Sequence, residues 1–189
     1  MDSHGDVHIN GCFDETVEVK QGSIYYIINH DLAIGSVIGM PKDVYMSVES
    51  KTWKQLGRDY GGSLQVLQFT VGLKGYANDA FVKSVNAGMP IENSIRMRYD
   101  DMVLCVNNPE YKAEYTAWKK YIKNVANSDE AEKQGYFWAI TKLSIEKEGS
   151  AVLFGSNNAT PIQTSKTMDI IVEEVKESVT KAPTWLNLM

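Results

Sequence analysis

The sequence predicts an α+β domain in which a mainly antiparallel β-barrel or mixed sheet is wrapped by helices. Short β-branched and aromatic runs are interrupted by amphipathic helical stretches, without the regular strand–helix–strand rhythm of a parallel fold. The chain has 189 residues, of which 43% are hydrophobic, and this is enough for one sizeable core. We therefore expect one domain over residues 1–160, followed over residues 161–189 by an amphipathic helix and a tail.

The expected strands are runs of β-branched and aromatic residues bounded by turn residues. They cover residues 24–28, 44–48, 64–71, 136–145 and 149–154, with a further strand starting near Ser94. The charged run 146–148 is expected to separate the last two, and the three glycines within 57–62 predict a loop.

The expected helices cover residues 78–87, 109–125, 128–134 and 167–179. Asn78 can cap the first and Gly88 can end it, while Asn108 is a suitable cap for the second, with Pro109 in its first position. Residues 2–22 are polar, with turn signals at Asn10-Gly11 and Gln21-Gly22.

Composition argues against several classes of function. A net charge of -5 gives no basic surface for a nucleic acid. The polar, acidic N-terminus and the lack of an apolar run of about eighteen residues predict neither a signal peptide nor a membrane span. The two cysteines are too few for a disulfide framework and fit a reducing compartment.

The residue types allow a serine hydrolase. Such an enzyme needs a base of near-neutral pKa to take the hydroxyl proton, and a third group to orient that base. The chain has three histidines, and it offers His30, Ser94 and Glu148 as base, nucleophile and orienting acid. They are so far apart in sequence that only folding could join them, and other serines fit the same logic.

Four motifs in order make the choice specific. Residues 2–14 (DSHGDVHINGCFD) form the first, and a strand ending in His30-Asp31 forms the second. Ser94-Ile95 is the third, and residues 148–157 (EGSAVLFGSN) are the fourth and most distinctive. Together they resemble the prohead proteases of tailed bacteriophages over about residues 2–160.

The resemblance implies an assemblin-like fold, a compact β-barrel wrapped by helices that is shared with the herpesvirus capsid proteases. It implies His30 as general base, Ser94 as nucleophile and Glu148 as the acid that orients His30, with no cofactor. The implied substrates are the phage's major capsid and scaffolding proteins, and the chain itself, inside the immature prohead in the host cytoplasm. Related viral proteases dimerise, so a homodimer is a further hypothesis.

The chain departs from the family pattern in two places. Arg96 stands where the family often has glycine, so its side chain must either alter the oxyanion arrangement or point outward. The chain also begins almost directly at the first motif, whereas relatives usually have an earlier strand. Arg96 is the feature that favours the main alternative, a catalytically inactive assembly or scaffold protein that retains the fold.

Other readings of the same residues stay open. Ser150 is a rival nucleophile, and Cys12 or Cys105 paired with His30 would make a cysteine protease, although buried serines and thiols are usually inert. A hydrolase of small esters is a third class of function.

A metal site is also conceivable near the N-terminus. His4 and His8 lie close in sequence to Asp2 and Asp6, but no matching ligand cluster occurs elsewhere. We therefore expect solvated side chains and no metal.

Overall fold

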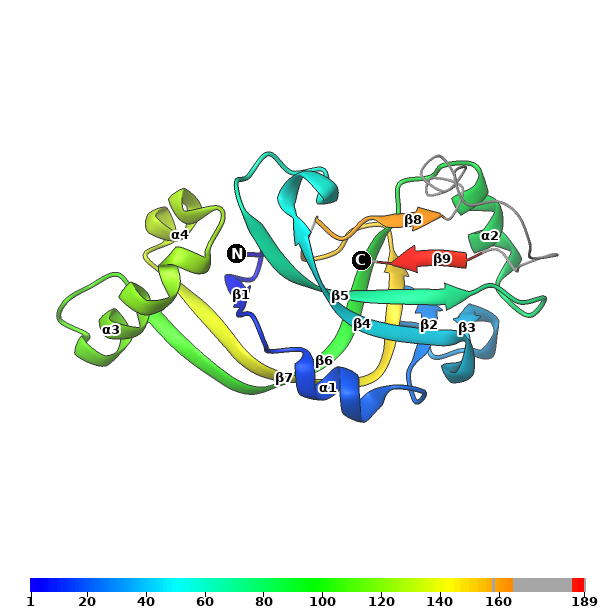
Figure 1. The fold of residues 1–189 in the computed structure, drawn as a ribbon, viewed down its shortest axis with the longest axis horizontal. Coiled ribbons are helices and arrows are strands. Elements are labelled where there is room, and N and C mark those ends of the chain that lie inside the picture. The colour runs from blue at the N-terminus through cyan, green and yellow to red at the C-terminus, as the bar shows by residue number, and fades with distance from the viewer. Residues whose placement is uncertain (158, 165–184, 189) are drawn as a thin grey trace, which may run out of the picture.

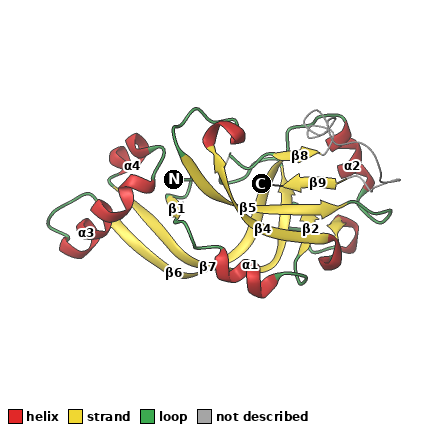
Figure 2. Ribbon diagram, viewed as in Figure 1, coloured by secondary structure: helices red, strands yellow, loops and turns green. Residues whose placement is uncertain are grey.

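The computed structural model describes residues 1–157, 159–164 and 185–188, and over these residues the fold is α+β (Figures 1 and 2). Its strands form a five-stranded and a four-stranded sheet. The expected mixed, mainly antiparallel sheet with attached helices is present. The expected closed barrel is not, because the described strands form two separate sheets.

The first sheet is organised around one long strand, β7. Its members are β1 (Asp6–His8), β2 (Tyr25–Ile28), β3 (Val37–Gly39), β6 (Glu92–Val106) and β7 (Tyr136–Val152). Strands β1 and β2 pair with β7 in parallel, while β6 pairs with it antiparallel along its whole length. Strand β7 therefore lies between β6 on one side and β1 and β2 on the other.

The second sheet packs against the first. It contains β4 (Val44–Thr52), β5 (Ser63–Gly72), β8 (Ile162–Thr164) and β9 (Trp185–Leu188). Phe69 of β5 lies against Tyr26 of β2, with ring centroids 5.8 Å apart, and both side chains are buried in the main hydrophobic core. Burial of large apolar side chains between the sheets is the main force that holds them together.

Among the residues that the structure describes, four α-helices lie around the sheets: α1 (Asp14–Lys20), α2 (Asp79–Asn86), α3 (Lys112–Tyr121) and α4 (Ser128–Gln134). Helices α3 and α4 sit at the far end of the long β6–β7 hairpin, away from β2 and β3 (Figure 1). They enclose a second hydrophobic cluster, which includes Trp118 and Phe137. No helix in the described part of the chain is long and apolar enough to span a membrane.

Several sequence predictions are confirmed. Strands β2, β4 and β5, the loop at 57–62 and helix α4 lie where they were expected. Asn78 caps α2 by accepting a hydrogen bond from the backbone N–H of Phe81, 3.0 Å away. The helix predicted over 167–179 lies outside the described residues.

Two predictions about elements are wrong, and one helix was not predicted. Helix α3 starts at Lys112 rather than Pro109, and Asn108 instead accepts from the N–H of Glu110 within the preceding turn. Helix α1 lies in the polar stretch for which the sequence indicated only turns. The two strands expected on either side of 146–148 are one continuous strand, β7.

Candidate active site

His30 sits in a tight turn that follows β2. Asn29 and His30 both have left-handed backbone conformations, with φ of 52° and 56°. Residues other than glycine seldom adopt this conformation, so the surrounding structure must hold it. The N–H of Asn29 donates to the carbonyl of Ala151, and the N–H of His30 donates to Oγ of Ser150 at 2.8 Å. Both partners lie on β7, which anchors the turn.

Ser94 and Glu148 are brought close by the register of β6 against β7. Ser94 pairs with Ser150, and Glu148 lies two residues before Ser150 on the same face of β7. The register shifts between Ile95 and Met97, so that Glu148 lies within an irregularity of the ladder. The charged run that resembled a turn in the sequence is therefore an irregular part of a strand, and it carries a candidate site residue.

The three predicted site residues form a continuous hydrogen-bonded chain. Nε2 of His30 lies 2.9 Å from Oγ of Ser94, and Nδ1 of His30 lies 2.8 Å from Oε1 of Glu148. An ionised carboxylate can only accept, so Nδ1 donates to Glu148 and Nε2 is left to accept the hydroxyl proton of Ser94. This tautomer is the one that a general base for Ser94 needs.

Burial differs across the site in a way that suits this chemistry. The side chain of Glu148 is fully buried, whereas that of His30 is 34% exposed. Burial raises the pKa of the Tyr26 hydroxyl well above its ordinary value, and the charge of Glu148 adds to this effect. The carboxylate is thus inside the protein, and the imidazole and the Ser94 hydroxyl are closer to solvent.

Arg96 points toward the site rather than simply outward. Its Nε lies 3.3 Å from Oε1 of Glu148, and its Nη2 donates to the backbone carbonyl of His30 at 3.4 Å. Sequence reasoning had identified Arg96 only as a departure from a family pattern. The alternation of side chains along a strand could have placed it on the face of Ser94, but not against Glu148.

The rival nucleophiles have other roles. Oγ of Ser150 accepts from the His30 N–H and lies 3.3 Å from the carbonyl of Ile27, so Ser150 holds the turn. Cys12 and Cys105 are free and buried, and burial raises their pKa to about 12 and about 11. Such thiols form little thiolate at neutral pH.

The acidic N-terminal segment forms a local cluster. Ligand atoms of Asp2, His4 and Asp6 lie within 4.8 Å of one another. However, Asp2 accepts hydrogen bonds from the N–H groups of His4 and Asp6, and Asp6 accepts one from the Tyr99 hydroxyl. These carboxylates therefore stabilise the N-terminal turn and its contact with β6. His8 does not join this cluster and stacks on Phe13.

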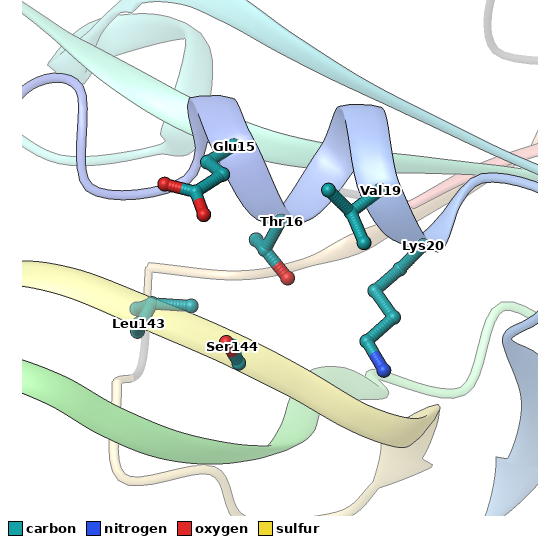
Figure 3. Close-up of a pocket in the computed structure, with 6 residues that line it drawn as sticks. All are labelled: Glu15, Thr16, Val19, Lys20, Leu143 and Ser144. Carbon is teal, nitrogen blue, oxygen red and sulfur yellow. The ribbon is translucent and has the colours of Figure 1, made fainter.

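A small surface hollow lies between α1 and β7 (Figure 3). It is lined by Glu15, Thr16, Val19, Lys20, Leu143 and Ser144. Ser144 is four residues from Glu148, about 13 Å along a strand, and the hollow is therefore separate from the hydrogen-bonded chain.

No family model, curated protein or solved structure matches this chain.

Proposed function

We propose that this chain is a serine endopeptidase in which Ser94 is the nucleophile, His30 the general base and Glu148 the orienting acid. The observation that carries the proposal is the continuous contact from Ser94 through His30 to a fully buried carboxylate. Three residues far apart in sequence meet in the order that the reaction needs, and each has the chemistry that its role requires.

In the proposed reaction, Oγ of Ser94 attacks the scissile carbonyl while Nε2 of His30 takes its proton. The imidazolium then donates that proton to the leaving amine, and an acyl-enzyme remains. His30 next activates a water molecule, which releases the acid and restores Ser94. The charge of Glu148 stabilises the imidazolium formed in both steps.

The proposed setting follows the resemblance of the four motifs. It is maturation of a phage head inside the immature prohead in the host cytoplasm, with scaffolding and major capsid proteins, and the chain itself, as substrates. The two-sheet arrangement would be a version of the assemblin-like fold. A homodimer belongs to the same proposal, and sedimentation at working concentration would test it, since a monomer would remove it.

The direct test uses Ser94→Ala, with Ser63→Ala as a control that changes an exposed serine on β5. A fluorophosphonate reagent should form a P–O bond to Oγ of Ser94 and release fluoride in the parent and the control, seen as a mass increase. Ser94→Ala should not be labelled and should lose self-cleavage by at least about a thousandfold.

Each alternative class of function predicts a different result. An inactive assembly protein gives no labelling and identical stable bands for parent and variant. An esterase is labelled and hydrolyses an activated ester, but cleaves neither its own chain nor an unfolded protein. Labelling of Ser94→Ala to the parent extent would contradict the proposed nucleophile.

A further inference from the structure

Arg96 shares one face of β6 with Ser94. The two residues are separated by one position, so their side chains project to the same side of the sheet. The ladder irregularity between Ile95 and Met97 places Arg96 opposite the segment of β7 that contains Glu148. The guanidinium therefore reaches the interior end of the site, while its side chain stays 40% exposed.

The guanidinium joins two parts of the site. Nε contacts Oε1 of Glu148, and this is the same oxygen that accepts from Nδ1 of His30. Nη2 donates to the carbonyl of His30, the residue whose left-handed backbone must be held from outside. Arg96 thus braces the carboxylate and the histidine backbone at once, and the planar fork of an arginine is suited to two such contacts.

Glu148 needs a permanent counter-charge. Its side chain is fully buried, and an isolated buried carboxylate is costly unless it is paired. Within the described residues its ion-pair partners are His30 and Arg96. His30 must be neutral when it acts as a base, so during that step Arg96 supplies the positive charge.

We propose that Arg96 is a positioning residue that orients Glu148 and the backbone of His30, and thereby holds the imidazole where it can act as a base. This inference rests on the proposed function. It reverses the expectation that Arg96 marks an inactive protein.

Other charged groups near His30 are engaged elsewhere. Asp31, its neighbour in the turn, accepts from the hydroxyl of Ser36 and the N–H of Ala33. Glu92, at the start of β6, accepts from the N–H of Gly155. Tyr26 of β2 is buried and neutral. Within the described part of the chain, the charged side chains in contact with His30 are those of Glu148 and Arg96.

The test compares Arg96→Met with Arg96→Lys. The control is Arg98→Met, which removes an exposed arginine of the same strand that pairs with Asp100 at 2.8 Å. The rate of fluorophosphonate labelling is measured for each variant at the same pH. Arg96→Met should label about tenfold to a hundredfold more slowly than the parent.

The other two variants separate charge from packing. Arg96→Lys should label faster than Arg96→Met, because the charge remains, but more slowly than the parent, because one ammonium cannot make both contacts. Arg98→Met should label at the parent rate. An Arg96→Met rate equal to the parent's would overturn the inference. So would a slower Arg96→Met in which the imidazole of His30 keeps the parent's NMR signal, which a direct role in binding the oxyanion would give.

A second readout does not depend on activity. The C2 proton of the His30 imidazole is observed by NMR at one fixed pH, and is assigned with His30→Gln. Its chemical shift should change in Arg96→Met, because the imidazole is displaced, and stay in place in Arg98→Met. A parent that cannot be labelled would contradict the proposed function, whereas an unchanged signal in Arg96→Met would contradict the role of Arg96, so the two failures are distinguishable.

Discussion

At the scale of single residues, the site depends on how the backbone of His30 is held. Two consecutive non-glycine residues in the left-handed conformation cost energy that other contacts must offset. The bond from the His30 N–H to Oγ of Ser150 is one of these contacts, and the bond from Arg96 to the His30 carbonyl is another. Ser150 therefore affects the position of the imidazole through its hydrogen bond to the backbone of His30.

Ser150→Ala should weaken both stability and the site. The variant leaves the His30 N–H without its partner, which should lower the free energy of unfolding by about 1–3 kcal/mol. Displacement of the imidazole should slow fluorophosphonate labelling of Ser94 by about tenfold to a hundredfold. Urea unfolding and labelling rates measure the two effects.

Ser144→Ala is the control, because it removes a β7 hydroxyl that bonds to Asp100 instead. It should label at the parent rate. A Ser150→Ala variant that labels as fast as Ser144→Ala would show that the turn holds His30 without this hydroxyl.

The residues of the site were predictable to different degrees. His30, Ser94 and Glu148 were identified from ordered motifs, and the structure brings them together. The contacts of Arg96 and Ser150 depend on the register of β6, β7 and β2, which no local pattern specifies.

At the scale of elements, the errors have physical causes. Strand β7 was predicted as two strands because Glu146-Lys147-Glu148 has the polarity of a turn. In the structure Glu148 is buried, because the sheet brings partners to its carboxylate. Helix α1 was missed because its segment has several β-branched residues and a weak apolar pattern. It is instead held by tertiary contact, since Oγ1 of Thr16 accepts from the N–H of Ile145.

Gly149 marks a close approach of the two sheets. A Cβ atom at this position would lie 2.9 Å from the ring of Phe69 and 3.1 Å from that of Tyr26. Glycine is needed here because there is no room for a side chain, and its φ is not in the left-handed region. It also lies directly between Glu148 and Ser150, so the packing of the sheets and the site share one short segment.

Gly149→Ala should therefore destabilise the protein. The two aromatic rings must move to admit a methyl group, at a cost of about 1–3 kcal/mol in the free energy of unfolding. Chemical denaturation measures this cost. Gly61→Ala is the control, because nothing lies within 4 Å of the added atom, and it should be neutral or slightly stabilising. Equal stability of the two variants would contradict the tight contact.

At the scale of the whole molecule, the α+β class was predictable from the sequence. Whether the strands close into one barrel or form two packed sheets was not. Alternating apolar patterns identify strands but do not say which strands become neighbours. Pairing of β2 with β7 joins residues more than a hundred positions apart, as the 118-residue separation of His30 and Glu148 illustrates. Such long-range pairings decide between a barrel and two packed sheets.

His8 should make global stability depend on pH. Burial lowers its pKa, an effect that the negative charges of Asp2 and Asp6 oppose. The unfolded chain takes up a proton at this histidine near pH 6.5, about its ordinary pKa, whereas the folded protein keeps it neutral to lower pH. The unfolded state therefore binds more protons in this window, and stability falls as the pH falls below about 6.5.

His8→Phe should remove this loss while keeping the stacking on Phe13. Between about pH 7.5 and pH 5, its free energy of unfolding should fall less than that of the parent, by at most about 1.4 kcal/mol per pH unit within the window. His4→Asn, at an exposed position, is the control and should follow the parent. Parallel curves for His8→Phe and the parent would contradict the prediction.

The parallel pairing of β2 with β7 also sets when the three side chains can first meet during synthesis. His30 and Ser94 leave the ribosome well before Glu148, and the turn that orients His30 is fastened to residues 150 and 151. A nascent chain that ends before this point lacks both the carboxylate and the anchor. Whatever chemistry the assembled site performs is thus latent until synthesis has passed residue 151, and the growing polypeptide is shielded from it until then.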